Sequence, residues 1–501
     1  VRVLTVAGLL ACLASGCTSG GSSVGKEAAA DEIKKGGFTV AASCHDPQII
    51  REGDTYYMFG SHMVGAKCQD LRKWNYFANG VDAANTLFDN LLTEPYAAFD
   101  FVGKNTDNGY SVWASNVIYN ETMKKYVMYF CTTSSYVKST LCFATADNIE
   151  GPYTYVDTIL YSGYGKSNIS ETNLYDVLGK NADISRYLEY GGYNNKEWPN
   201  CIDPAIFTDA DGRMWMNYGS WSGGIFLLEI DPTTGYPIYP VDDKDADPYY
   251  GYRLIGGGHH SAEGPYIQYD AENGYYYLFV SYGDLQSDGG YQIRQFRSEK
   301  PTGPYVDVAG NTLEDQDDHF NYGLKMMGNY TFPSLNYTYM APGGQSTFQD
   351  DDGKYYITYH QRFDDGTEYH EPRVHQMYTN EDGWFVAAPF ATMGETLSEK
   401  GYKKSDVSGT FYVVNHGTDI SSKIREAEAY TFADGKVTGG EKSGTYEVKE
   451  GTDYITITLD GVVYKGVLME MTDEAENPVF CFSAAGDNEE TLWGVQYIKK
   501  E

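Results

Sequence analysis

The chain has 501 residues, enough for a large domain and a smaller one, and a formal net charge of −33 at pH 7. So negative a protein is not expected to bind nucleic acid or an anionic membrane surface, whereas a neutral polymer such as a glycan would suffer no repulsion. Aromatic residues make up 15% of the chain, with 47 tyrosines, and 55 glycines stand against 17 prolines. This composition favours an all-β protein of short strands and tight turns.

The N-terminus has the pattern of an export signal. Arg2 precedes an apolar run, Val3 to Ala14, that is too short to span a bilayer, and the ending Ala-Ser-Gly-Cys at Cys17 resembles a bacterial lipobox. Residues 1–17 are predicted to be a lipoprotein-type signal peptide, with an ordinary signal peptide as the alternative. Residues 18–36 are expected to be a flexible tether. The protein is therefore predicted to be exported, either secreted or held at the outer membrane or cell surface only through a lipid on Cys17.

One strand pattern recurs along most of the chain: a turn residue, then several aromatic, β-branched or bulky positions. The copies begin roughly 60 to 90 residues apart, a spacing that fits one supersecondary unit per copy. Repeated all-β units at this interval predict a five-bladed β-propeller, with one four-stranded sheet per blade. A β-sandwich with similar hairpins is the alternative. The copies lie at 53–60, 124–129, 211–218, 273–280 and 352–359.

The repeat stops after about Ala388, and shorter alternating runs such as Tyr454–Leu459 follow. These runs predict a small antiparallel β-barrel or sandwich. We therefore expect the propeller over residues 37–395 and an accessory β domain over 396–501. The accessory domain shows no catalytic grouping, so glycan binding, stabilisation of the propeller and a spacer role all remain open.

Three carboxylic acids precede the repeated strands at similar distances. Asp46, Asp203 and Glu263 lie ten, twelve and thirteen residues before the corresponding strand position. Asn116 lies ten before its own, and Gly343-Gly344-Gln345 lies eleven to thirteen before that of the fifth copy. Because the first strand of each blade lines the channel of a propeller, these acids are expected to converge there. Like charges resist shared burial, so acids kept together usually do acid–base work. Taken singly, Asp-Pro and Glu-Gly-Pro fit simple turns equally well.

These motifs resemble those of glycoside hydrolase family 43, and within it of bacterial extracellular endo-α-1,5-L-arabinanases with a C-terminal β domain. The resemblance implies endo cleavage of arabinan, a pectin side chain of the plant cell wall, by an inverting mechanism that needs no cofactor. It also implies Asp46 as general base, Glu263 as general acid, and Asp203 as the residue that orients the acid and tunes its pKa. The matching segments are 45–47, 111–117, 202–207, 218–226, 263–267, 275–283, 371–377 and 381–384.

Four further residues are predicted to contact sugar. Trp113 and Trp221 offer flat aromatic faces that can stack on sugar rings, although either could instead pack between blades. Asn116 and Ser220 could form hydrogen bonds with sugar hydroxyls. The segment 155–199, rich in Tyr, Asn and Gly, is expected to border the cleft.

The chain departs from the family at the channel metal. Related arabinanases have Gly-His-Asn-Ser where this chain has Gly343-Gly344-Gln345-Ser346, and that histidine is associated with a metal, often calcium. Gly344 has no side chain to coordinate an ion, so no metal ligand is assigned. Structural calcium held by waters and carboxylates remains open.

Two rival functions remain open beside the endo-arabinanase reading. The first is an exo-acting α-L-arabinofuranosidase or β-xylosidase on the same scaffold, because cleavage mode depends on loop shapes that the sequence does not show. The second is a surface glycan-binding lipoprotein without catalysis. Such a protein would not need three acids at matching positions before the repeated strands. The protein is expected to act as a monomer.

Overall fold

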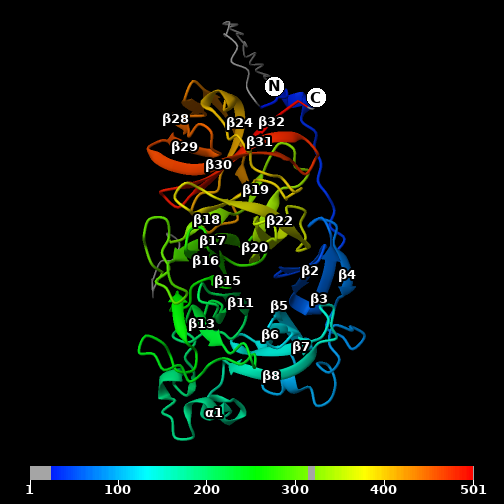
Figure 1. The fold of residues 1–501 in the computed structure, drawn as a ribbon. Coiled ribbons are helices and arrows are strands. Elements are labelled where there is room, and N and C mark those ends of the chain that lie inside the picture. The colour runs from blue at the N-terminus through cyan, green and yellow to red at the C-terminus, as the bar shows by residue number, and fades with distance from the viewer. Residues whose placement is uncertain (1–23, 314–321, 500–501) are drawn as a thin grey trace, which may run out of the picture.

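The computed structural model describes residues 24–313 and 322–499 (Figure 1). The predicted signal peptide, its Cys17 and residues 18–23 of the predicted tether lie outside these residues. In the part of the chain described, no helix is both long and apolar enough to cross a bilayer.

The larger part of the molecule is a five-bladed β-propeller, as the repeat predicts, and each blade is an antiparallel sheet. Blade 1 has strands β1 (Gln48–Glu52), β2 (Thr55–Gly60), β3 (Val64–Cys68) and β4 (Asn75–Ala78), and blade 2 has β5 (Ser111–Asn120), β6 (Lys125–Ser135), β7 (Lys138–Ala146) and β8 (Thr154–Tyr161). Blade 3 has β11 (Ala205–Thr208), β12 (Met214–Tyr218), β13 (Ile225–Ile230) and β14 (Tyr252–Ile255), and blade 4 has β15 (Ala262–Asp270), β16 (Tyr275–Tyr282), β17 (Gln292–Ser298) and β18 (Leu324–Met327). Blade 5 has β20 (Tyr339–Gln349), β21 (Tyr355–Phe363), β22 (His370–Thr379) and β23 (Phe385–Ala387), extended beside β20 by β19 (Tyr330–Thr331) and β25 (Arg425–Glu426).

Each copy of the repeated sequence pattern is the second strand of its blade, counted from the channel. This strand is covered on both faces by neighbouring blades. In β16, Tyr277, Leu278, Phe279 and Val280 are all completely buried. A strand buried on both faces has consecutive apolar residues instead of an alternating pattern, which is why the repeat is visible in the sequence.

Side chains close the ring between blade 5 and blade 1. The Tyr56 hydroxyl donates a 2.5 Å hydrogen bond to Asp350 Oδ2, and Arg51 forms an ion pair with the same carboxylate. Ser346 Oγ donates to the carbonyl oxygen of Pro47 at 2.8 Å. These contacts hold blade 1 against blade 5 beside the channel, where Asp46 lies.

The C-terminal domain is a closed eight-stranded antiparallel barrel, which decides between the predicted barrel and sandwich. It joins the propeller firmly: β25 leaves the barrel and pairs in parallel with β19, and Tyr330 and Trp493 pack with ring centroids 5.1 Å apart. The barrel strands are β24 (Gly409–Asn415), β26 (Glu428–Ala433), β27 (Lys436–Gly439), β28 (Lys442–Val448), β29 (Tyr454–Leu459), β30 (Val462–Thr472), β31 (Pro478–Gly486) and β32 (Thr491–Tyr497).

The predicted flexible tether is wrong for residues 24–36. Val24 is buried, Glu27 forms an antiparallel bridge with Ile498, and Gly36 forms a parallel bridge with Leu335. Gly, Ser and Ala are typical of tethers, but they also let a chain lie closely along a barrel wall. Figure 1 shows both ends of the described chain at the barrel, with the N-terminal segment running down to blade 1.

The helices are short and lie between strands. The insertion between β8 and β11 contains α1 (Leu174–Leu178), and the hairpin β9 (Leu188–Glu189) and β10 (Gly192–Tyr193). It packs on blade 3, where the rings of Trp198 and Tyr250 stack with centroids 5.7 Å apart. Short 3-10 helices are η1 (Ala30–Glu32), η2 (Ser61–Met63), η3 (Ala97–Phe99), η4 (Ile169–Glu171), η5 (Ser185–Tyr187) and η6 (Lys404–Asp406).

Candidate active site

The five blades share one local backbone feature at the channel. Asp46, Ala114, Asp203, Gly264 and Gly344 all have left-handed backbone, with φ of 54°, 48°, 57°, 57° and 58° respectively. In blades 2, 4 and 5 the ladder between the first and second strands is interrupted at this residue. Such a bulge turns the strand and redirects a side chain. The spacing seen in the sequence therefore marks one left-handed residue per blade at the channel, and in blades 2, 4 and 5 this residue lies in a bulge.

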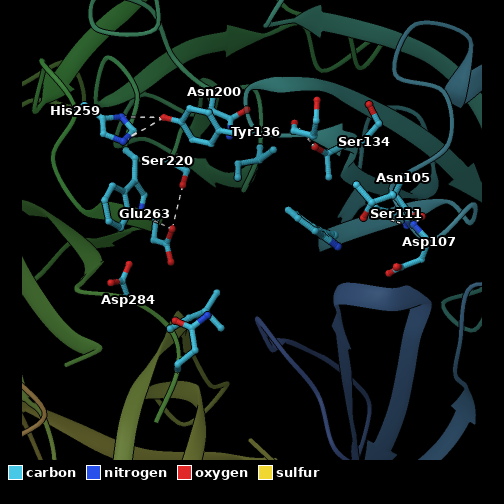
Figure 2. Close-up of a pocket in the computed structure, with 18 of the residues that line it drawn as sticks. Asn105, Asp107, Ser111, Ser134, Tyr136, Asn200, Ser220, His259, Glu263 and Asp284 are labelled. Atoms are coloured by element: carbon cyan, nitrogen blue, oxygen red, sulfur yellow. Dashed lines mark hydrogen bonds between the residues drawn. The ribbon is translucent and has the colours of Figure 1, made fainter. Parts of the chain in front are cut away.

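These left-handed turns of the backbone bring the three predicted acids to one place. Asp46, Asp203 and Glu263 all line a single cavity of about 420 Å³ at the mouth of the channel. Glu263 also lines a second cavity of about 630 Å³, shown in Figure 2. Trp113 and Ile202 belong to both cavities, so the two form one groove that continues on either side of Glu263.

Glu263 is held by three donors. Its Oε2 accepts hydrogen bonds from Trp221 Nε1 at 2.9 Å and from Ser220 Oγ at 3.1 Å, and its Oε1 accepts one from the Tyr291 hydroxyl at 2.7 Å (Figure 2 draws the Ser220 bond). Burial raises the pKa of Glu263 above its ordinary value, the charge of Asp46 adds to this, and the three donors only partly oppose it. This carboxyl group is thus suited to keep a proton.

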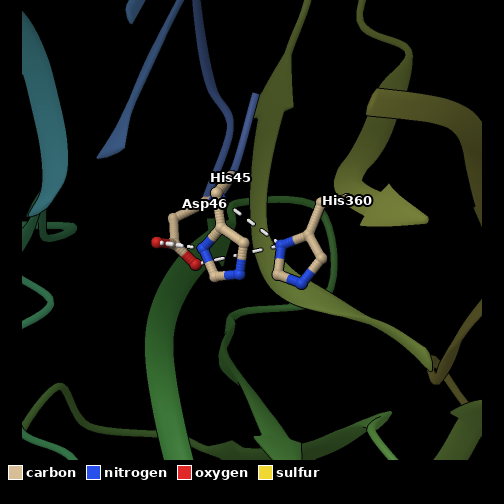
Figure 3. A group of neighbouring side chains, drawn as sticks. All are labelled: His45, Asp46 and His360. Atoms are coloured by element: carbon tan, nitrogen blue, oxygen red, sulfur yellow. Dashed lines mark hydrogen bonds and ion pairs between the residues drawn. The ribbon is translucent and has the colours of Figure 1, made fainter. Parts of the chain in front are cut away.

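Asp46 has the opposite electrostatic balance. His45 Nδ1 lies 2.7 Å from Asp46 Oδ2, and Ser61 Oγ donates a hydrogen bond to the same oxygen at 2.5 Å (Figure 3 shows the histidine contact). Burial alone would raise the pKa of Asp46, but the charge and hydrogen bonds of these neighbours outweigh it and lower the pKa below its ordinary value. Its side chain keeps 23% of its surface exposed, so water can reach it.

Asp203 interacts electrostatically with both of the other acids. Burial raises its pKa well above the ordinary value, and the negative charges of Asp46 and Glu263 raise it further. Its Oδ2 accepts a 3.1 Å hydrogen bond from the backbone N–H of Gly264, the residue after Glu263. Asp203 therefore fixes the backbone that carries Glu263, and its electrostatic interaction with Glu263 links the proton equilibria of the two groups.

The predicted sugar contacts divide into two groups. Trp113, Ser220 and Trp221 line the groove, and the last two also donate to Glu263. Asn116 is buried, and its Oδ1 accepts a hydrogen bond from the backbone N–H of Ile206 at 3.1 Å. It does not line either cavity of the groove, but it lines a narrow cavity of about 40 Å³ that it shares with Asp46 and Asp203 and to which the first strand of every blade contributes. The structure thus does not bring Asn116 to the groove.

The insertion was expected to border the cleft, and this expectation is wrong for residues 155–199. None of these residues lines either cavity of the groove, and only Asn200, just past the segment, does. Tyr and Asn in the insertion bond to one another and to blade 3 instead: Tyr193 donates to the carbonyl oxygen of Pro199, and Tyr249 donates to Asn173. The tyrosines and asparagines of this insertion therefore take part in packing.

Sequence reasoning missed Tyr291, His45 and Ser61 as partners of the acids. Tyr291 is one tyrosine among 47, and no spacing distinguishes it. His45 stands next to Asp46, which was a usable signal, because a neighbouring imidazole lowers the pKa of a carboxyl group. Ser61 begins η2, directly after β2, and reaches Asp46 only in the folded blade.

The residues around Gly344 decide whether the channel fits the calcium ion that the family resemblance implies. A Cβ on Gly344 would lie 2.8 Å from the His360 ring, so His360 fills the space of the missing side chain. His45, Asp46 and His360 have ligand atoms within 4.8 Å of one another (Figure 3). Two imidazoles and one carboxylate do not fit calcium, which takes six to eight oxygen ligands. We therefore assign no step to a metal.

Comparison with known proteins agrees with this geometry. Residues 177–385 match the model of glycosyl hydrolases family 43, and residues 389–494 match a C-terminal lipocalin-like domain of that family. The chain is similar to extracellular endo-α-(1→5)-L-arabinanase 2 of Bacillus subtilis (38% identity, 90% of this chain and 92% of the relative) and to that of Thermotoga petrophila (36%, 91% and 94%). The crystal structure of endo-1,5-α-L-arabinanase from Thermotoga petrophila superposes with a TM-score of 0.79 at 35% identity, over 93% of this chain and all of that one. Since these relatives match along nearly their whole length, the chain belongs to glycosyl hydrolases family 43.

Proposed function

We propose that this protein is an endo-α-1,5-L-arabinanase that hydrolyses the arabinan of plant cell walls with inversion. The observation that carries the proposal is the groove in which Asp46, Asp203 and Glu263 meet. The names of the two relatives similar over nine tenths of the chain point to the same substrate. No cofactor takes part in the proposed chemistry.

The electrostatics of the site support one assignment of roles. Asp46, with its lowered pKa, is ionised and accepts a proton from the attacking water. Glu263, with its raised pKa, donates a proton to the oxygen of the departing sugar. Asp203 holds the backbone beside Glu263 and, through their electrostatic interaction, tunes the proton equilibrium of the acid. Inversion further requires a gap of about 6.5–9.5 Å between base and acid, wide enough for the water.

The shape of the groove favours endo over exo cleavage. The cavity with all three acids receives the sugar whose bond breaks, and the larger cavity beyond Glu263 receives the departing part of the chain. Space on both sides lets a polymer bind in its middle, whereas an exo enzyme closes one side around a chain end. An exo-acting arabinofuranosidase or β-xylosidase is the second candidate, since both would use the same acids.

The time course of products from linear arabinan tests the proposal. Oligomers that appear before arabinose support endo cleavage, and arabinose alone from the start would contradict it. Glu263→Gln should reduce turnover by a factor of about 10² to 10⁴ while polymer binding persists. Glu272→Gln, on the exposed turn of the same blade, is the matched control and should keep full activity. Binding without any product would favour the non-catalytic glycan-binding alternative.

We further propose export, in line with the extracellular relatives, and anchoring through a lipid on Cys17. Labelling with a radioactive fatty acid in a bacterial host that processes lipoproteins tests the anchor. The wild-type chain should take up label, and Cys17→Ala should not. An unlabelled, secreted wild-type protein would favour the ordinary signal peptide.

A further inference from the structure

A second groove lies on blade 5 outside the channel. It has a volume of about 340 Å³ and shares no lining residue with the two cavities of the active-site groove. We call it the rim groove and define it by Phe38, Tyr337, Phe363 and Tyr369, which give it aromatic walls, and by Glu371 and Arg373 at its base.

Two tyrosine rings in the walls of the rim groove are exposed to solvent, and packing of the fold does not explain their positions. Tyr337 has 58% of its surface exposed and Tyr369 has 47%, whereas Phe363 beside them is buried. The rings of Tyr337 and Phe363 meet edge to face with centroids 6.0 Å apart, which fixes the orientation of the outer ring. Single exposed aromatics are common, but two of them beside one concave site are typical of a binding surface.

The base of the rim groove is a buried, neutralised ion pair. Arg373 Nη1 lies 2.9 Å from Glu371 Oε2, and the two side chains keep only 2% and 8% exposure. The Arg373 guanidinium also lies over the Phe38 ring at 4.5 Å, so its plane is held in place. The pair offers rigid donors and acceptors, and Asp365 adds a negative charge to the lining. A negative lining disfavours an anion, and the fixed donors and acceptors suit a ligand with many hydroxyl groups.

The rim groove is connected to the active site by one turn. Residues between β21 and β22 place Asp365 and Tyr369 in the rim groove, and Glu368 and His370 in the cavity of the three acids. The turn is held in position because Ser287 Oγ donates to Glu368 at 2.7 Å and Arg362 forms an ion pair with it at 2.8 Å. A polymer that leaves the active site across this turn meets the two exposed tyrosines.

We propose that the rim groove binds a second segment of the same neutral polysaccharide that the channel cleaves. The sugar rings stack on Tyr337 and Tyr369, and their hydroxyls bond to the Glu371–Arg373 pair. The identity of the polymer, linear arabinan, rests on the proposed function. A site of this kind raises affinity for long chains and leaves the cleavage of short ones unchanged, because short chains fill only the channel.

Kinetics on a polymer and on a short oligomer separate the two sites. In Tyr337→Ala/Tyr369→Ala, KM for linear arabinan should rise about tenfold, as expected for the loss of two stacking contacts. KM for arabinotetraose and kcat on both substrates should stay at the wild-type values. Tyr337→Phe/Tyr369→Phe keeps the ring faces and should retain affinity for the polymer. Tyr190→Ala, at a fully exposed tyrosine on the β9–β10 hairpin, is the surface control.

An unchanged KM for polymer in the double alanine variant would overturn the proposal that the rim groove binds polymer. An equal rise in KM for arabinotetraose would overturn it as well. If the wild-type enzyme does not cleave arabinan, the proposed function fails, but the groove remains testable by affinity electrophoresis in gels that contain arabinan, galactan or xylan. If one of these polymers retards the wild-type protein but not the double alanine variant, the result supports polymer binding in the rim groove. If none of them retards the wild type, the proposal is overturned.

Discussion

Tyr291→Phe removes one hydrogen bond from the proposed general acid and little else. The Tyr291 hydroxyl donates to Glu263 Oε1 at 2.7 Å, while its ring stacks on His360 with centroids 5.6 Å apart. Phenylalanine keeps the stacked ring. The variant therefore isolates the contribution of one donor to the proton equilibrium of Glu263.

The direction of the effect follows from which form of Glu263 the bond stabilises. A hydroxyl that donates to a carboxylate favours the ionised form, so its loss raises the pKa of Glu263 further. A hydrogen bond to a charged group contributes about 1.5–3 kcal/mol, and about 1.4 kcal/mol corresponds to one pH unit. Because the groove is open to water, we expect the lower end, a change of about one pH unit.

The pH dependence of kcat/KM on linear arabinan measures this effect. The acid must carry its proton, so activity is lost as the pH rises through the pKa of Glu263, and this alkaline limb should move to higher pH by about one unit. Tyr276→Phe is the matched control, because its hydroxyl accepts a hydrogen bond from Ala210 N–H at 2.9 Å, away from the groove. An alkaline limb that stays in place, or that moves to lower pH, would refute the assignment of Glu263 as the acid held by Tyr291.

Two further substitutions test the other side of the site. His45→Ala removes the charge and hydrogen bond that lower the pKa of Asp46. The acid limb of the kcat/KM profile, where the base gains its proton, should therefore move to higher pH. An acid limb that does not move would argue against Asp46 as the base. Gly344→Ala brings a Cβ against Asp46 Oδ1 and to 2.8 Å from His360, so we expect thermal denaturation at lower temperature and a large loss of kcat. Gly212→Ala has the same left-handed backbone but open space around it, and it should lose some stability and keep its activity.

The architecture was readable from the sequence because it rests on local regularities. A strand buried on both faces needs consecutive apolar residues, so the second strand of each blade could be counted from the chain alone. The acids were found for a related reason: each precedes that strand by nearly the same number of residues, since one residue with left-handed backbone recurs at the channel. Asn116 obeyed the same spacing but lies two residues past the bulge, and its side chain points to Ile206.

Contacts between distant segments were decided only by the tertiary structure. Tyr291, just before β17, reaches Glu263 on β15 across blade 4, and Gly344 of blade 5 lies against Asp46 of blade 1. No spacing along the chain encodes these meetings. The same holds for residues 24–36, whose composition suggested a tether until pairing with Ile498 gave them a surface to cover. The sequence by itself determined which residue types and periodicities are present, whereas the fold decided their burial and neighbours, and those set the pKa of each acid.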